Sequence, residues 1–256
     1  MGLSGRVNIL GVGISPLTLD GATQQIASWI ESGERHYVNV CTVHTVMECQ
    51  KEPELKRIVN RSGMATPDGM PLVWLCHYYG AKNVTRVYGP DLLLFLCANP
   101  SSKGYRHFFY GGATGVADAL AERLKQQFPE LIVAGAYSPP MLAVGQLEHP
   151  NTISMINSSN ADIVWVGLGT PKQDFWVARH RPLLNAPVLV AVGAAFDFFT
   201  GRIPQAPIWM QRNGLEWLFR LAKEPRRLAY RYLIYNPLFI LSLLAQISGL
   251  RHYPLL

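Results

Sequence analysis

The chain has 256 residues, of which 49% are hydrophobic and 16% are charged, and its formal net charge is +6. This apolar content excludes a disordered chain, because disordered chains lack the apolar residues that build a core. Since no apolar run approaches the roughly 20 residues that span a bilayer and no signal peptide is recognisable, we expect a cytoplasmic protein without a transmembrane helix.

The positive charge is concentrated at the end of the chain. From Arg202 onward there are eight Lys or Arg and two Asp or Glu, whereas residues 1–201 hold 15 of each sign. We therefore predict a core over residues 1–201 and an appended element over residues 202–256. A basic segment of this kind favours an anionic partner, such as a lipid surface, a nucleic acid or a phosphorylated substrate.

Short apolar runs alternate with amphipathic segments through the predicted core. The predicted strands are Val7–Ile14, Tyr37–Cys41, His107–Tyr110, Leu131–Ala136, Ile163–Leu168 and Val188–Val192. The predicted helices are Gly21–Glu31, Leu72–Tyr79, Gly89–Ala98, Thr114–Phe128 and Pro171–His180. This alternation predicts an α/β fold with a mostly parallel sheet and helices on both faces, and a ligand site at the carboxyl ends of the strands.

Two glycine clusters follow predicted strands. Gly11 and Gly13 lie where a dinucleotide fingerprint would start, but Pro16 occupies the position of its third glycine. We interpret this cluster as a tight turn, which makes an NAD-dependent oxidoreductase a disfavoured alternative. Gly111 and Gly112 open a helix, where backbone N–H groups bind phosphate, although an ordinary strand-to-helix turn explains them as well.

Charged residues also lie in two loops that lead into predicted helices. Asp68, between Pro67 and Gly69, is a candidate general base or a helix cap, and the sequence does not separate these interpretations. Arg86 is a candidate for binding an anion, and Asp91 is interpreted as a helix cap or as its ion-pair partner.

Two later loops repeat this design. Thr170 is the predicted cap of the helix at Pro171, so that Lys172 and Gln173 in its first turn face a polar or phosphorylated ligand. Asp197 is either a buried structural carboxylate or a hydrogen-bonding group for a sugar or base.

Metal chemistry has little support in the sequence. There is no D-x-D motif, and the seven histidines and four cysteines lack ligand spacing. His44 lies at the predicted site edge, where a lone histidine is more often structural. We expect no metal and no other cofactor.

The appendage mixes basic and aromatic residues. Helices are predicted over Ala206–Lys223 and from Pro225, with a break at Asn236-Pro237 before a short apolar helix, Leu238–Ile247. This composition suits an interfacial membrane anchor. A nucleic-acid-binding module and a solvated charged face remain alternatives, but the apolar helix favours a membrane.

Taken together, these segments resemble the WecG/TagA/CpsF family of bacterial glycosyltransferases from Asn8 to about Tyr235. The resemblance rests on the order of several short motifs, which are Thr42 with His44, Thr66–Met70, Arg86–Asp91, Gly167–Asp174, Gly193–Asp197, Gly214–Arg220 and Glu224–Arg227.

The family resemblance implies a Rossmann-like fold and an inverting, metal-independent transfer from a UDP-sugar to a saccharide on undecaprenyl diphosphate. It implies that Asp68 is the base, that Thr42, Arg86 and Gln173 lie in the sugar pocket, and that the appendage docks on the inner face of the plasma membrane. We expect donor binding by His44, Gly111, Gly112, Tyr137, Gly169, Lys172 and Asp197, and contacts to the acceptor diphosphate or the membrane by Arg212, Arg220, Arg227 and Arg231. No nucleic acid is expected as a partner, and a homo-oligomer is possible. Members that use N-acetylmannosamine often carry Asn where His44 stands, so the donor sugar stays open.

Overall fold

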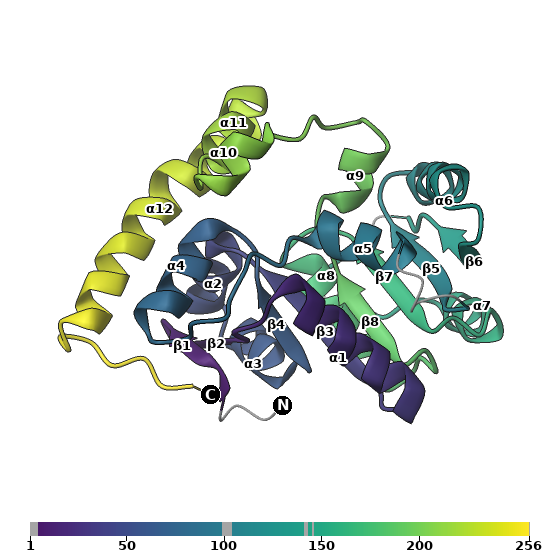
Figure 1. The fold of residues 1–256 in the computed structure, drawn as a ribbon, viewed down its shortest axis with the longest axis horizontal. Coiled ribbons are helices and arrows are strands. Elements are labelled where there is room, and N and C mark those ends of the chain that lie inside the picture. Colours follow the sequence, from purple (N-terminus) through teal and green to yellow (C-terminus); the bar gives the residue numbers. More distant parts are fainter. Residues whose placement is uncertain (1–4, 99–103, 141–142, 145, 256) are drawn as a thin grey trace.

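A six-stranded parallel sheet forms the centre of the computed structural model, which describes residues 5–98, 104–140, 143–144 and 146–255 (Figure 1). The strand order is β4-β3-β8-β7-β5-β6, and all neighbouring pairs are parallel. The strands are β3 (His36–Cys41), β4 (Met64–Pro67), β5 (Arg106–Gly111), β6 (Ile132–Tyr137), β7 (Ile163–Gly167) and β8 (Val188–Ala191). The predicted α/β class with a mostly parallel sheet is confirmed.

Helices cover both faces of this sheet. One face packs against α1 (Leu19–Ser32), α5 (Gly89–Ala98), α6 (Val116–Gln127) and α9 (Ala195–Phe199). The other packs against α2 (Val43–Lys51), α3 (Pro53–Arg61), α7 (Pro150–Ser158) and α8 (Lys172–His180). Successive residues of one strand enter different clusters, as Phe108 and Phe109 do, because side chains alternate along a strand.

The first predicted strand is wrong. Residues 7–14 form a separate antiparallel hairpin of β1 (Val7–Ile9) and β2 (Val12–Ile14), with Leu10 and Gly11 at its turn. Both turn residues have positive φ, 52° and 79°, which matches the right-handed twist of a two-residue hairpin. The Gly11 cluster is therefore a tight turn, as expected, but it joins two strands rather than a strand and a helix.

Strand β4 was missed because it ends in Pro67. Proline lacks the N–H of the sheet ladder and is confined to sheet edges, and β4 is an edge strand. It places Asp68 beside the end of β3, where the Asp68 N–H donates to the Cys41 carbonyl at 2.7 Å. Helix α4 (Met70–Tyr78) follows directly.

The appendage is helical in the described residues beyond α9, as predicted, but its boundaries differ. Gly214 separates α10 (Ile208–Arg212) from α11 (Glu216–Lys223). Its φ of 70° lies in the left-handed region. Pro225 begins α12 as predicted. The predicted break at Asn236-Pro237 is wrong, since α12 runs through Pro237 from Pro225 to Ile247.

Helix α12 lies along one side of the molecule, next to α2 and α4 (Figure 1). Tyr235 and Phe239 are buried in a cluster with α2 residues, whereas Leu241 on the outer surface is 63% exposed. By length and composition alone α12 is able to cross a membrane, which revises the expectation from the sequence.

The end of α12 and the segment after it contact the hairpin. Gln246 accepts from the Leu10 N–H at 2.9 Å and donates to the Asn8 carbonyl at 3.0 Å, and Asn8 donates to the Tyr253 carbonyl at 2.7 Å. These bonds join the two ends of the described chain.

Candidate functional site

A cavity of about 1650 Å³ opens at the carboxyl ends of the sheet. Residues that follow all six strands line the cavity, namely Thr42 after β3, Asp68 after β4, Gly112 after β5, Pro139 after β6, Gly169 after β7 and Gly193 after β8. Parallel strands bring these distant segments to one edge, which is where α/β folds bind ligands. The position predicted from the sequence, at the carboxyl ends of the strands, coincides with this cavity.

Asp68 and Arg86 form an ion pair on the cavity wall. Arg86 Nε donates to Asp68 Oδ1 at 3.1 Å, and Arg86 Nη2 lies 3.0 Å from the same oxygen. The N-cap residue of α4 is Gly69, without a side-chain capping bond, so the capping interpretation of Asp68 is wrong. Arg86 pairs with Asp68 rather than with Asp91, which lies in the first turn of α5.

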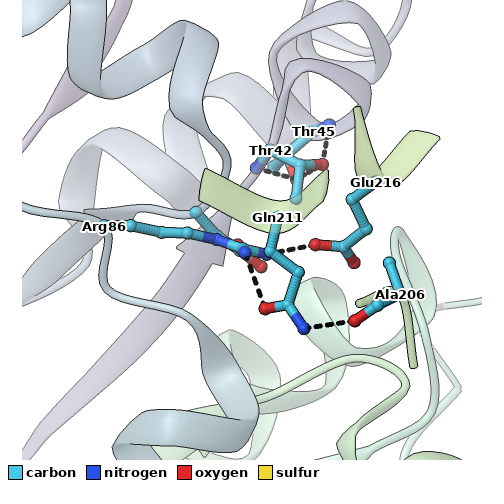
Figure 2. A network of polar contacts seen from close by, with 7 residues as sticks. Thr42, Thr45, Arg86, Ala206, Gln211 and Glu216 are labelled. Carbon is cyan, nitrogen blue, oxygen red and sulfur yellow. Dashed lines mark hydrogen bonds and ion pairs between the residues drawn. The ribbon is translucent and has the colours of Figure 1, made fainter. Parts of the chain in front are cut away.

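Two residues of the appendage complete the surroundings of Arg86 (Figure 2). Glu216 Oε2 accepts from Arg86 Nη2 at 2.5 Å, and Gln211 Oε1 accepts from Nη1 at 3.2 Å. Gln211 is itself held because its Nε2 donates to the Ala206 carbonyl at 2.8 Å. Neither Glu216 nor Gln211 was predicted to have a role. Glu216 lies in the family motif Gly214–Arg220, in which only Arg220 was predicted to contact a substrate or the membrane.

The pKa of Asp68 is raised by its surroundings. Burial raises this pKa from 3.8 to about 6, Arg86 lowers it in part, and Glu216 raises it. Burial alone would lower the pKa of Arg86, but the carboxylates of Asp68 and Glu216 raise it. Arg86 is therefore cationic throughout the physiological range, whereas Asp68 titrates close to it, which suits a general base.

Gln173 joins the loops after β7 and β8. Its Oε1 accepts from the Gly169 N–H at 3.1 Å and from the Gly193 N–H at 2.9 Å. Its neighbour Thr170 does not cap α8, contrary to the prediction, because the N-cap residue is Pro171 and no side-chain capping bond is present. Gln173 thus fixes the shape of this cavity wall from within the first turn of α8.

A buried pair lies directly behind Gln173. Asn39 Nδ2 donates to Asp174 Oδ1 at 2.7 Å, and both residues are fully buried. The remaining oxygens, Asn39 Oδ1 and Asp174 Oδ2, have no hydrogen-bond partner among the described residues. Burial raises the pKa of Asp174 to about 6. Hydrogen bonds with Asn39 and Thr170 lower this pKa in part.

Thr42 and His44 lie at the start of α2 and line the cavity. Thr42 forms a capping box with Thr45, accepting from the Thr45 N–H at 3.3 Å and donating its own N–H to Thr45 Oγ1 at 3.1 Å (Figure 2). His44 stacks on Tyr235 of α12, with ring centroids 5.6 Å apart. Burial, reinforced by Arg231, lowers the pKa of His44 to about 3, so its ring is neutral.

Three of the four predicted tail arginines line the cavity: Arg220, Arg227 and Arg231. Arg212 is exposed and is not part of the wall. Arg227 pairs with Glu224 at 2.6 Å. Within the described residues Arg220 and Arg231 form no ion pair, and the buried Nε of Arg220 has no hydrogen-bond partner. The cavity therefore holds cationic groups whose charge is free for an anion.

The predicted donor-binding residues divide into two sets. Four line the cavity in addition to His44, namely Gly112, Gly169, Lys172 and Asp197. Asp197 also lies 3.4 Å from Arg202 Nε in an ion pair. The other two, Gly111 and Tyr137, end strands β5 and β6 and are not part of the wall.

The described residues contain no group of three or more His, Cys, Asp or Glu side chains placed to hold a metal ion. The charged groups at the cavity include the buried carboxylate of Asp68, which titrates near neutrality, and several arginines, together with Lys172 and the carboxylates of Asp197 and Glu216. Such a set can accept a proton from a substrate hydroxyl and stabilise a phosphate anion that leaves.

The model of the family described as "Glycosyl transferase WecG/TagA/CpsF family" matches residues 7–253. Two relatives, from Bacillus spizizenii (strain ATCC 23059 / NRRL B-14472 / W23) and Bacillus subtilis (strain 168), are both named N-acetylglucosaminyldiphosphoundecaprenol N-acetyl-beta-D-mannosaminyltransferase. The first is 28% identical over 228 residues, which cover 88% of this chain and 86% of the relative. The second is 26% identical over 230 residues, which cover 86% and 87%.

Proposed function

Because this chain belongs to the WecG/TagA/CpsF family of glycosyltransferases, we propose that it moves a hexose or N-acetylhexosamine from a UDP-sugar to a saccharide on a polyprenyl diphosphate. Both relatives are named for transfer of N-acetylmannosamine to N-acetylglucosaminyl diphosphoundecaprenol. N-acetylmannosamine is therefore the first donor sugar to test. This transfer is a step in the synthesis of a bacterial surface polysaccharide.

The observation that carries this proposal is the position of Asp68 in a cavity that also contains unpaired arginines. In a single displacement, an acceptor hydroxyl oxygen forms a bond to the anomeric carbon while the bond from that carbon to the diphosphate oxygen breaks. Asp68 takes the hydroxyl proton, and UDP leaves with the electron pair of the broken bond. Attack opposite the leaving group inverts the anomeric centre.

Arginines supply the positive charge that the leaving diphosphate needs. Arg220 and Arg231 have no ion-pair partner among the described residues, and Lys172 lies in the first turn of α8, whose N-terminus also favours an anion. Arg86 is different, since Asp68 and Glu216 already compensate its charge. We assign Arg86 the role of orienting Asp68. The transfer proposed here proceeds without a metal ion.

We further propose that the protein associates with the inner face of the plasma membrane through the appendage. A polyprenyl acceptor is confined to a membrane, and α12 combines exposed leucines with basic residues in its first two turns. Because Tyr235 and Phe239 are buried against the core, α12 lies on the membrane surface in this arrangement rather than across the bilayer.

The experiment that tests this function combines UDP binding with transfer. Calorimetry in EDTA should detect UDP, and Asp68→Asn should bind UDP like the wild type but lose a factor of order 10² or more in kcat. Asp91→Asn is the matched control, because Asp91 does not line the cavity, and it should retain activity. Transfer that Asp68→Asn leaves intact would refute the role of Asp68, and absence of UDP binding would favour a lipid-binding module without catalysis.

A further inference from the structure

The cavity extends beyond the charged residues into an apolar groove between α4 and α12. We define this groove by Met70 and Trp74 on α4 and by Tyr232, Asn236, Ile240 and Leu243 on α12, which all line the cavity. The residues from α12 recur at three- and four-residue spacing, so they share one side of the helix. Both helices contribute residues to the same hydrophobic cluster.

The groove begins at the cationic end of the cavity. Arg220 lies close enough to Tyr232 to lower the pKa of its hydroxyl, although burial dominates and raises that pKa overall. Arg220 also lowers the pKa of Asp68 in part, and Arg220, Asp68 and the groove residues line the same cavity. The buried Nε of Arg220 has no hydrogen-bond partner, which leaves a donor for an anion at the entrance.

The walls of the groove are apolar but are not packed away from solvent. Trp74 is 51% exposed and Ile240 is 56% exposed. A soluble protein gains little by exposing a tryptophan and an isoleucine along one channel, and contiguous apolar surface of this kind marks a binding site. From Tyr232 to Leu243 the helix advances roughly 16 Å at 1.5 Å per residue.

We infer that this groove binds the hydrocarbon chain of the acceptor, over the isoprene units that adjoin its diphosphate. The inference rests on the proposed function. Continuity with Arg220 selects this occupant, because a polyprenyl diphosphate is an anion followed immediately by an apolar chain, in the order that the cavity wall provides. The first units of the chain thus leave the membrane and contact the protein, while the remainder stays in the lipid.

The test uses acceptors that are soluble without detergent or membranes, so that binding to the groove is separated from partition into lipid. The same saccharide diphosphate is prepared with a methyl group and with a chain of three isoprene units, below its micelle concentration. The prenyl acceptor should have a KM lower by at least about tenfold, because burying even one branched unit is worth a factor of this size.

Two variants with matched controls locate the effect. Ile240→Ser and Trp74→Ala should raise the KM of the prenyl acceptor about tenfold and leave the KM of the methyl acceptor and UDP binding unchanged. Leu241→Ser and Tyr78→Ala alter equally exposed residues of the same helices that do not line the cavity, and they should change neither KM.

Equal KM values for the two acceptors, or equal effects of groove and control variants, would overturn the inference. A prenyl KM that varies with protein concentration, together with a dimer in sedimentation, would assign the groove to a second copy of the chain and also overturn it. Failure of the proposed function is distinguishable, since the methyl acceptor would then receive no sugar and UDP would not bind.

Discussion

Among individual residues, the balance between burial and ion pairing at Asp68 determines the pH range of the site. The pKa of Asp68 is about 6 in the folded protein, against 3.8 for a free side chain. A general base must be ionised, so kcat/KM should be half of its plateau near pH 6 and fall about tenfold per pH unit below it. A pH–rate profile of the wild type tests this expectation.

Glu216 offers a second measurement on the same group. Glu216 raises the pKa of Asp68, so Glu216→Gln should move the acidic limb of the profile to lower pH. An acidic limb that stays in place in Glu216→Gln would show that another group produces it.

Asp174 should make the stability of the protein depend on pH. Its pKa rises from 3.8 to about 6 on folding because of burial, so the folded state binds more protons between these values. The stability from this group is fully present below pH 4 and is lost as the pH rises through 6, by up to about 3 kcal/mol. Asp174→Asn mimics the protonated acid and should be more stable than the wild type at pH 7.5 but not at pH 4, as measured by urea unfolding.

The double variant Asn39→Asp/Asp174→Asn is the control, because it exchanges the acid and the amide within the pair. It should restore the wild-type pH dependence that Asp174→Asn abolishes. If Asp174→Asn is instead destabilised more at pH 7.5 than at pH 4, the fold requires the ionised carboxylate.

At the scale of elements, the junction between α10 and α11 positions the acidic residue that contacts Arg86. Gly214 has φ of 70°, and a Cβ there would lie 2.9 Å from Trp74. Gly214→Ala should therefore cost about 1–2 kcal/mol of stability and lower kcat by displacing Glu216. Gly249→Ala is the matched control, since Gly249 has φ of 76° with open space around it. It should lose stability through strain but keep kcat, whereas equal kcat losses would contradict a positioning role of the junction.

Some elements of the fold follow from the local sequence, whereas others do not. Five strands were predicted nearly in place because β-branched and aromatic runs flanked by glycine are strong local signals. The edge strand β4 was not predicted because it ends in Pro67. A helix break was expected at Pro237, but α12 continues through it, because Tyr235 and Phe239 on either side of Pro237 pack in the core. The residues of the hairpin at Gly11 have the apolar pattern of a strand, but nothing in the sequence indicates that they form a separate two-stranded sheet.

The candidate site shows the same division between local and distant information. Asp68 and Gln173 lie in short motifs that follow strands, so their convergence follows from a parallel sheet. Arg86 lies in the loop between α4 and α5, which the Val87 N–H joins to the Pro67 carbonyl at the end of β4. Glu216 and Gln211 reach Arg86 across more than 120 residues of sequence, and no local pattern specifies which face of the appendage meets the core.

For the whole molecule, the arrangement of the appendage predicts how the protein binds membranes. Vesicles with anionic lipid should bind it more tightly than neutral vesicles, and added salt should weaken the binding, because basic residues of α11 and α12 contribute to it. Leu241→Ser/Leu244→Ser, on the outer surface of α12, should weaken co-sedimentation at least about tenfold. Leu183→Ser, an exposed leucine after α8, should not. Equal binding by both variants would place the membrane contact elsewhere.

The hydrogen bonds between the hairpin and the end of α12 link residues that are synthesised at very different times. Leu10 is made before Gln246, whose side chain accepts from its N–H and which follows it by 236 positions. The ribosome releases the central strands long before it releases the helix that carries Arg227 and Arg231. A nascent chain can therefore build its sheet early but has no complete cavity, so the enzyme becomes competent only after translation has passed α12.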